Sequence, residues 1–331
     1  PFRSDRFEQG DTNRVDVLWV LDNSNSMNFV LDLATSAAET IFEVLDDEDI
    51  DYQTSLVTTD VVGSDGAPCA LLDVQPGDDW LRGSCGFFSD GDDIVQRPEW
   101  KIVTERTRPS PQRAFTGLLD VPRGGAAIES GLEAVRLALT PPRITGWNLG
   151  FLRTDADLAI IIISNEDDHG LQPVPFYTGL VTSLKGFAGR RSTINAIIPP
   201  VLCLPGSQQA GRCIPAGSRR YAEAALRTGG IVENIGVDGD ASFEAQTAEF
   251  ADKLFNVVFS ATSLRALFPL SERPAPGTLE VRIDGGVVDP VSPAGGTNWT
   301  YEQAGNRVRF TERGRPAPGS TIDIRYQTFC F

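Results

Sequence analysis

The stretch that decides the fold is residues 15–27, which read VDVLWVLDNSNSM. Its first seven residues are apolar except for Asp16, and they have the length of a strand. A short polar loop follows, and residues 29–45 then carry apolar side chains three and four positions apart, which is one face of a helix. A strand that leads through a short loop into a helix is typical of a parallel sheet covered by helices. We therefore expect the loop to lie at the carboxyl end of the first strand, where ligands bind in open α/β sheets.

The alternation of strand and helix patterns continues to about residue 262. Further strands are expected at 54–59, 158–163, 194–198 and 231–235, and further helices at 128–139, 176–187, 221–227 and 243–257. The strand at 158–163 is apolar on both faces, as a strand covered by helices on both sides must be. Gly229-Gly230 stands where a C-cap would end the preceding helix. The expected fold class is α/β, a doubly wound, mostly parallel, Rossmann-like sheet.

Residues 63–116 interrupt this alternation. They are rich in Gly, Pro, Asp and Ser, and they are too long for a bare loop in a compact domain. We interpret them as an insertion with hairpins of its own.

The pattern of apolar and polar residues changes again near the C-terminus. Apolar residues at 279–283 alternate with polar ones and end at Asp284-Gly285-Gly286, which indicates a hairpin turn. The same alternation of apolar and polar residues then recurs toward the C-terminus, and no helical pattern interrupts it. This predicts a small antiparallel β domain. The expected division is a domain at 1–262 and a β domain at 266–331.

Charge and hydropathy exclude some classes of partner. The formal net charge is -16, whereas nucleic acids and anionic lipid surfaces are bound by clustered positive charge. No run of 18 apolar residues occurs, so the sequence predicts no membrane span. A protein ligand remains the expected partner.

The chain has five cysteines and one histidine, which makes a zinc site a poor interpretation because no cysteine pair has CxxC spacing. Cys203 and Cys213 bracket a Pro/Gly loop, and Cys69 and Cys85 lie in Gly-rich sequence. We expect these to form two short-range disulfides, with Cys330 left over. Disulfides imply an extracellular, cell-surface or periplasmic protein. Free buried thiols in a cytosolic protein are the alternative.

The loop after the first strand carries a candidate metal site. In an extended stretch, Asp22, Ser24 and Ser26 project to one side. One carboxylate and two hydroxyls are oxygen donors, which suit a hard divalent cation such as Mg²⁺, Mn²⁺ or Ca²⁺. The alternative is that these residues form an Asx turn and cap the following helix. Capping needs only one such residue, and here three stand at alternate positions.

Asp-x-Ser-x-Ser at this place resembles the metal-ion-dependent adhesion site of the von Willebrand factor A family. The resemblance covers roughly residues 12 to 262. Within that family, the chain is most similar to bacterial envelope proteins. These have the sequence Asn-Ser-x-Ser-Met in this loop and Ser-Asp-Glu-Asp-Asp in the loop after the fourth strand. The resemblance implies that Asp22, Ser24 and Ser26 are metal ligands. The neighbouring Asn23 and Asn25 would then face the bound ligand.

Two positions depart from the family pattern. Ala126 stands where the family has a threonine ligand, so Thr116 or Asp120 would have to reach in from the preceding loop. Asn165 stands where the family has its last acidic ligand, and its amide oxygen can still coordinate the metal, directly or through water, but brings no charge. In the following residues, Asp167 or Asp168 could substitute as metal ligands, and Glu166 could contact the bound ligand. The expected site binds its cation weakly or has lost it.

The resemblance implies a secreted or surface-displayed adhesion or binding module without enzymatic activity, in which a carboxylate of the partner takes the open position on the metal. One alternative is a structural or assembly component that kept the fold and lost the metal. Another is a phosphatase-like enzyme, but such folds need a second aspartate two positions after Asp22, where Ser24 stands. His169, the sole histidine, is interpreted as a loop residue.

Overall fold

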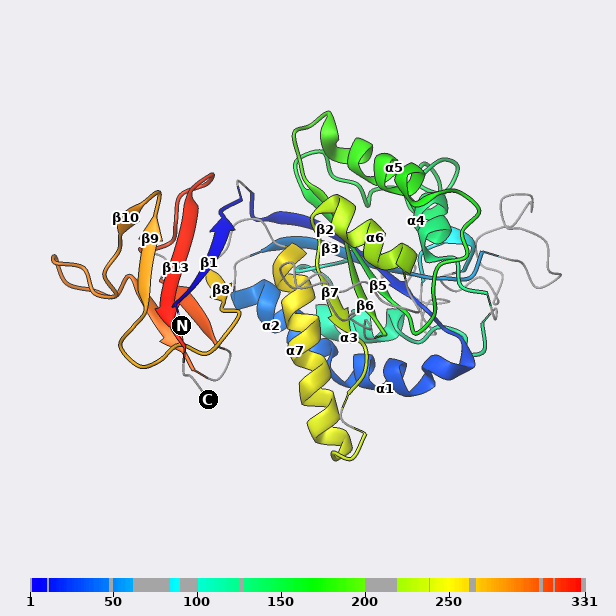
Figure 1. The fold of residues 1–331 in the computed structure, drawn as a ribbon. Helices are drawn as coiled ribbons and strands as arrows, with labels where there is room; N and C mark the ends of the chain where they lie inside the picture. Colours follow the sequence, from blue (N-terminus) through cyan, green and yellow to red (C-terminus); the bar gives the residue numbers. More distant parts are fainter. Residues whose placement is uncertain are drawn as a thin grey trace. The chain divides into compact units, whose positions relative to one another are not determined.

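The structure, a computed structural model, describes residues 2–10, 12–47, 50–61, 84–89, 101–125, 128–199, 219–237, 239–261, 266–303, 306–311 and 313–328. They form two compact units (Figure 1). The α/β unit comprises residues 14–47 and 51–261, and the β unit comprises residues 1–13, 48–50 and 262–331.

The α/β unit contains a six-stranded sheet in the order β4-β3-β2-β5-β6-β7. Its strands are β2 (Arg14–Leu21), β3 (Asp51–Thr58), β4 (Val103–Thr104), β5 (Asp157–Ile163), β6 (Ser192–Ile198) and β7 (Val232–Asn234). All neighbouring strands pair in parallel except β4, which is antiparallel to β3 at one edge. The chain runs from β2 outward to one edge and then, from β5, to the other. The expected doubly wound, mostly parallel sheet is confirmed.

Helices cover both faces of this sheet. They are α1 (Asn28–Ser36), α2 (Ala38–Asp47), α3 (Pro111–Leu118), α4 (Gly131–Leu139), α5 (Val174–Gly186), α6 (Arg219–Thr228) and α7 (Phe243–Ala261). Helices α4, α5 and α6 lie on one face, and α1, α2, α3 and α7 lie on the other (Figure 1). Burial on both faces explains why all seven residues of β5 are buried.

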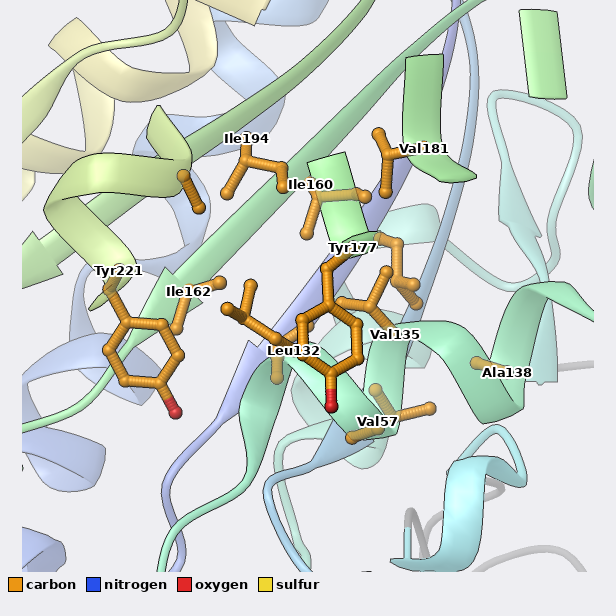
Figure 2. Packing of buried hydrophobic residues seen from close by; sticks show 14 of the residues in the cluster. Val57, Leu132, Val135, Ala138, Ile160, Ile162, Tyr177, Val181, Ile194 and Tyr221 are labelled. Atoms are coloured by element: carbon orange, nitrogen blue, oxygen red, sulfur yellow. The ribbon is translucent and has the colours of Figure 1, made fainter. Parts of the chain in front are cut away.

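The core between the sheet and α4–α6 is built from alternate residues of the strands. Ile160 and Ile162 of β5 point into it and meet Leu132 of α4 and Tyr177 of α5 (Figure 2). The opposite face is aromatic, and Trp19 of β2 is its centre. Its ring lies 5.5 Å from that of Phe115, and its Nε1 donates to Thr54 Oγ1 at 2.9 Å. Strand alternation therefore divides the apolar side chains between two cores.

The described structure differs from the expected insertion at 63–116. Strand β4 and helix α3 lie within that range, and both belong to the main sheet and its helical layer. Ser110 Oγ accepts from Arg113 N at 3.1 Å and Pro111 is the first helical residue, which are start signals that the polar composition obscured. Residues 62–83 and 90–100 lie outside the described residues.

Two expected helices also differ in extent. The helix expected at 29–45 is two helices, separated at Ala37, whose φ of −91° and ψ of 0° end the first one. Neither glycine nor proline marks this break, so periodicity could not show it. The helix expected from Ile128 begins at Gly131, and Ile128 is 60% exposed.

The β unit consists of two antiparallel sheets, ordered β1-β13-β9-β10 and β11-β12-β8. The strands are β1 (Phe2–Glu8), β8 (Leu267–Pro269), β9 (Glu280–Ile283), β10 (Gly286–Val287), β11 (Trp299–Glu302), β12 (Arg307–Phe310) and β13 (Thr321–Gln327). Asp284 and Gly285 have φ of 50° and 83°, and positive φ at both central residues is the geometry of the expected hairpin turn.

The N-terminal strand joins the C-terminal ones. Strand β1 pairs with β13 along its whole length, from Phe2 opposite Gln327 to Glu8 opposite Thr321. Residues 1–13 therefore group with the β unit, whereas the expected division placed them in a domain at 1–262. Residues 2–8 contain only two apolar side chains, Phe2 and Phe7, so no alternation marks this strand.

Deletion of residues 2–8 is expected to destabilise the β unit. The deletion exposes the edge of β13 and removes Phe7, whose ring lies 5.2 Å from that of the buried Phe268. Amide hydrogen exchange should show β13 losing protection, while the substitution Phe2→Ala, at a side chain that is 79% exposed, leaves it unchanged. Unchanged protection of β13 in the deletion variant would contradict the expectation.

The predicted disulfides fall largely outside the described residues. Cys85 is fully buried, whereas Cys69, Cys203, Cys213 and Cys330 are not described. Both pairings therefore stay predictions. Among the described helices, none is long and apolar enough to cross a membrane.

Candidate functional site

Polar residues gather where three neighbouring strands of the α/β unit end. Strand β2 is followed by Asp22, β3 by Thr59 and Asp60, and β5 by Ser164 and Asn165. The last residue of β2 pairs in parallel with the last residues of β3 and β5, so these loops emerge side by side. The carboxyl ends of adjacent parallel strands are where this architecture forms its ligand sites.

Asp22 is held in place by its neighbours. Its side chain is fully buried, and its Oδ1 accepts from Ser24 N at 2.9 Å while its Oδ2 accepts from Ser164 Oγ at 2.7 Å. The bond from Ser24 N is an Asx turn, so that part of the simpler interpretation of the loop is present. Hydrogen bonds of this kind fix the orientation of the carboxylate before any ligand arrives.

The other donors of the loop lie next to one another. Ser24 Oγ is 3.0 Å from Ser26 Oγ, and Ser26 Oγ donates to Asn165 Oδ1 at 3.4 Å. The hydroxyl of Ser24 makes no capping bond to the short helix that follows it. The structure thus brings together Asp22, Ser24, Ser26 and Asn165, and capping does not account for the serines.

Asp167 and Asp168 are directed elsewhere. Asp167 Oδ1 accepts from Arg220 N at the start of α6. Asp168 is buried; its Oδ1 accepts from Leu132 N at 3.0 Å, and its Oδ2 accepts from Arg220 Nε at 2.9 Å. Burial raises the pKa of Asp168, although the Arg220 guanidinium opposes this shift. Both carboxylates accept hydrogen bonds from backbone N–H groups at helix N-termini, so their role is structural and neither is directed at Asp22.

The residues expected to face a ligand divide into two groups. Asn23 is 1% exposed and supports the loop, because its Nδ2 donates to Pro122 O at 2.7 Å. Gly125 lies so close that a Cβ there would come within 2.5 Å of Asn23 Oδ1. Asn25 is exposed and Glu166 is half-buried, so both reach the surface.

In the part of the chain that the structure describes, neither residue considered as a substitute for the missing threonine is hydrogen-bonded to the loop. Thr116 Oγ1 donates to Gln112 O within α3, and Asp120 is exposed after that helix ends. Ala126 lies outside the described residues. His169 is an exposed loop residue, as expected, and its backbone N–H donates to Glu129 O at 2.7 Å.

Glu129 lies close to Asp22, and the sequence did not point to it. Its side chain is 1% exposed, and its Oε2 accepts from the hydroxyl of Thr59. Burial raises the pKa of Glu129 to about 8, with the nearby carboxylates of Asp22, Asp60 and Glu166 acting in the same direction and the Thr59 bond acting against them. Such an acid is largely protonated at neutral pH. A glutamate just before a helix is ordinary in sequence, so no local signal could have identified it.

The donor set fits a hard divalent cation in chemical type. Asp22, Ser24, Ser26 and Asn165 present only oxygen atoms, which are the ligands of Mg²⁺, Mn²⁺ and Ca²⁺. Over the described part of the chain, no group of three or more His, Cys, Asp or Glu side chains is arranged to hold a metal ion. Any cation here would thus depend on one carboxylate with neutral oxygens, unless a further group moves toward it.

Comparisons with known proteins give distant structural likenesses only. No family model matches the chain, and no curated protein matches it. Among solved structures, it is similar to a von Willebrand factor type A protein from Catenulispora acidiphila, at 10% identity and a TM-score of 0.41, with 100% of this chain and 66% of that one covered. It is also similar to the pilus adhesin SpaC from Lactobacillus rhamnosus GG, at 11% identity and a TM-score of 0.40, with 98% and 40% covered.

A third similar structure is proximal thread matrix protein 1 from the mussel byssus with a zinc-occupied MIDAS motif. The identity is 14% and the TM-score 0.35, with 76% of this chain and 47% of that one covered. The chain thus spans between 40% and 66% of the length of these three structures. At such identities and TM-scores the likeness carries no argument. The resemblance of this chain to von Willebrand factor A domains therefore lies in its own doubly wound sheet and in the loop that follows β2.

Proposed function

We propose that the α/β unit is a non-enzymatic binding module that recognises a carboxylate of a protein ligand through a divalent cation. The observation that carries this proposal is the convergence of Asp22, Ser24, Ser26 and Asn165 at the ends of β2 and β5. When bound, the cation would supply a positive charge with positions open to an acidic group of the partner. Asn25 and Glu166 reach the surface beside it and would contact that partner.

The chain's own residues would perform two tasks in such a site. Ser164 and the backbone of Ser24 hold the carboxylate of Asp22 in one orientation. Preorganised donors lower the cost of binding, because their side chains lose no further freedom when the cation arrives. Both predicted disulfides would suit a secreted or surface-displayed module.

A second candidate is a structural or assembly component that uses the fold without a cation. It is favoured by the hydrogen bonds that already satisfy both oxygens of Asp22 and join the hydroxyls of Ser24 and Ser26. A network that is satisfied without a metal does not require one for folding.

Thermal unfolding with and without Mn²⁺ distinguishes the two candidates. In the binding module, Mn²⁺ raises the midpoint and EDTA reverses the change, since a ligand at about 100 times its Kd adds about 2.7 kcal/mol to the free energy of unfolding. The control is Asp22→Asn, which keeps the shape of the side chain and the acceptor for Ser24 N, removes the charge, and reverses the other bond so that the amide donates to Ser164 Oγ. Asp22→Asn should unfold at a similar midpoint without metal and gain nothing from Mn²⁺.

Recognition of an acidic partner is tested on immobilised peptides that contain glutamate, with glutamine counterparts as the control. The module should retain the glutamate peptides in Mn²⁺ and release them in EDTA. If neither unfolding nor retention responds to Mn²⁺, the structural component is the better description.

A further inference from the structure

We infer that the Glu129 carboxylate is a further ligand of the cation held by Asp22, Ser24 and Ser26, and that it supplies the negative charge absent at Asn165. This inference rests on the proposed function and assigns the second charged ligand of its site. It concerns a residue outside the Asp-x-Ser-x-Ser loop and outside the segment that follows β5.

The backbone brings Glu129 to the end of β2. Thr59 N donates to Leu21 O at 3.0 Å, which places the end of β3 beside the residue that precedes Asp22. Ser130 N donates to Thr59 O at 3.3 Å, and the Thr59 hydroxyl donates to Glu129 Oε2. Glu129 is therefore fixed to the same strand end from which Asp22 projects.

One oxygen of the Glu129 carboxyl group has no hydrogen-bond partner in the described part of the chain. This oxygen is Oε1, and it is buried. Asn23 Oδ1, in the loop that carries Asp22, is a second buried acceptor in the same condition. Buried polar oxygens are normally satisfied, and in the ionised carboxylate Glu129 Oε1 can only accept, so that it is satisfied by a donor or by a cation. The site thus holds unused acceptors of the type that a hard divalent cation takes.

The surrounding charge points to a cation rather than to a neutral donor. Carboxylates of Asp22, Asp60 and Glu166 all lie close enough to Glu129 to oppose its ionisation. They come from the ends of three strands and would repel a fourth negative charge. A divalent cation among them would offset that repulsion, because a bound ion is the largest local charge in such a site.

A purely structural role for Glu129 makes a different prediction. In that case its protonated side chain only hydrogen-bonds with Thr59, and glutamine, which is neutral and of the same size, would replace it without consequence. Glu129→Gln therefore separates the two roles. Glu129→Asp keeps the charge on a shorter side chain and is the conservative variant.

The experiment is calorimetric titration of the full chain with Mn²⁺. We expect Glu129→Gln to weaken the Kd for Mn²⁺ by about tenfold or more, because even outer groups of metal sites contribute tenfold to a hundredfold. Its unfolding midpoint without metal should not fall. Glu129→Asp should bind Mn²⁺ more tightly than Glu129→Gln.

The matched control is Glu233→Gln. Burial also raises the pKa of Glu233, but its carboxyl group accepts from Asn256 of α7 instead of facing Asp22. This variant should bind Mn²⁺ as the unaltered chain does.

Equal Mn²⁺ affinity of the unaltered chain and Glu129→Gln would overturn the inference and leave the proposed function standing. If Glu129→Gln does not fold, Glu129→Ala takes its place: a folded Glu129→Ala that binds Mn²⁺ more weakly than Glu233→Gln supports the ligand role, and one that binds it equally well overturns the inference. Absence of Mn²⁺ binding by the unaltered chain would overturn both the inference and the metal-dependent function.

Discussion

Replacement of Asp16 by alanine is expected to lower the free energy of unfolding of the α/β unit by about 3–5 kcal/mol, the cost of breaking a buried ion pair from one side. Asp16 is fully buried near the start of β2, at the opposite end of that strand from the candidate site. Its Oδ2 lies 2.7 Å from Lys185 Nζ, and its Oδ1 lies 2.7 Å from Arg153 Nε. The side chain of Lys185 is 3% exposed, so without Asp16 its charge stays buried and uncompensated.

Urea unfolding followed by far-ultraviolet circular dichroism measures this loss. The double variant Asp16→Ala with Lys185→Met should recover part of it, because the orphaned charge is then removed as well. Glu223→Ala is the control, since its pair with Arg227 is exposed and such pairs contribute about 0.5 kcal/mol or less. A loss no larger than that of Glu223→Ala would contradict the expectation.

Phe268→Ala is expected to unfold the β unit. Phe268 of β8 is fully buried, and its ring packs edge-on against Phe7 at 5.2 Å and Phe310 at 5.4 Å. Loss of a buried phenylalanine costs about 3–5 kcal/mol. That is a large fraction of the stability of a unit with so small a core.

Hydrogen exchange resolves the effect by region. Protection should disappear from β11, β12 and β13 in Phe268→Ala, while β2 and β5 keep theirs. The control is Phe2→Ala, which removes a ring that is 79% exposed in the other sheet of the same unit. Equal loss of protection in β2 would mean that the two units unfold together.

The sequence was sufficient to predict those features that depend on a short, continuous stretch of residues. The run at 158–163 is apolar on both faces and became β5, and Gly229, with φ of 75°, ends α6 as the C-cap pattern indicated. The loop from Asp22 to Ser26 was found because three oxygen donors stand at alternate positions.

What could not be predicted depends on partners far apart in the chain. Asp168 resembled a metal ligand in sequence, but Arg220, 52 positions away, binds it. Glu129 lies near Asp22 only because Thr59, 70 positions away and just after the neighbouring strand, binds it. Strand β1 is defined by pairing with β13 and hardly by its own composition.

The pairing of β1 with β13 has a mechanical consequence. Because the strands are antiparallel and Phe2 lies opposite Gln327, the outer ends of both strands are at the same end of the ladder. Tension applied at those two residues separates the paired residues one after another, starting with Phe2 and Gln327, so the load is never shared by all the hydrogen bonds at once. The α/β unit lies in the stretch of chain that this ladder closes into a loop. A pulling force therefore reaches Asp22 only after β1 has been peeled from β13.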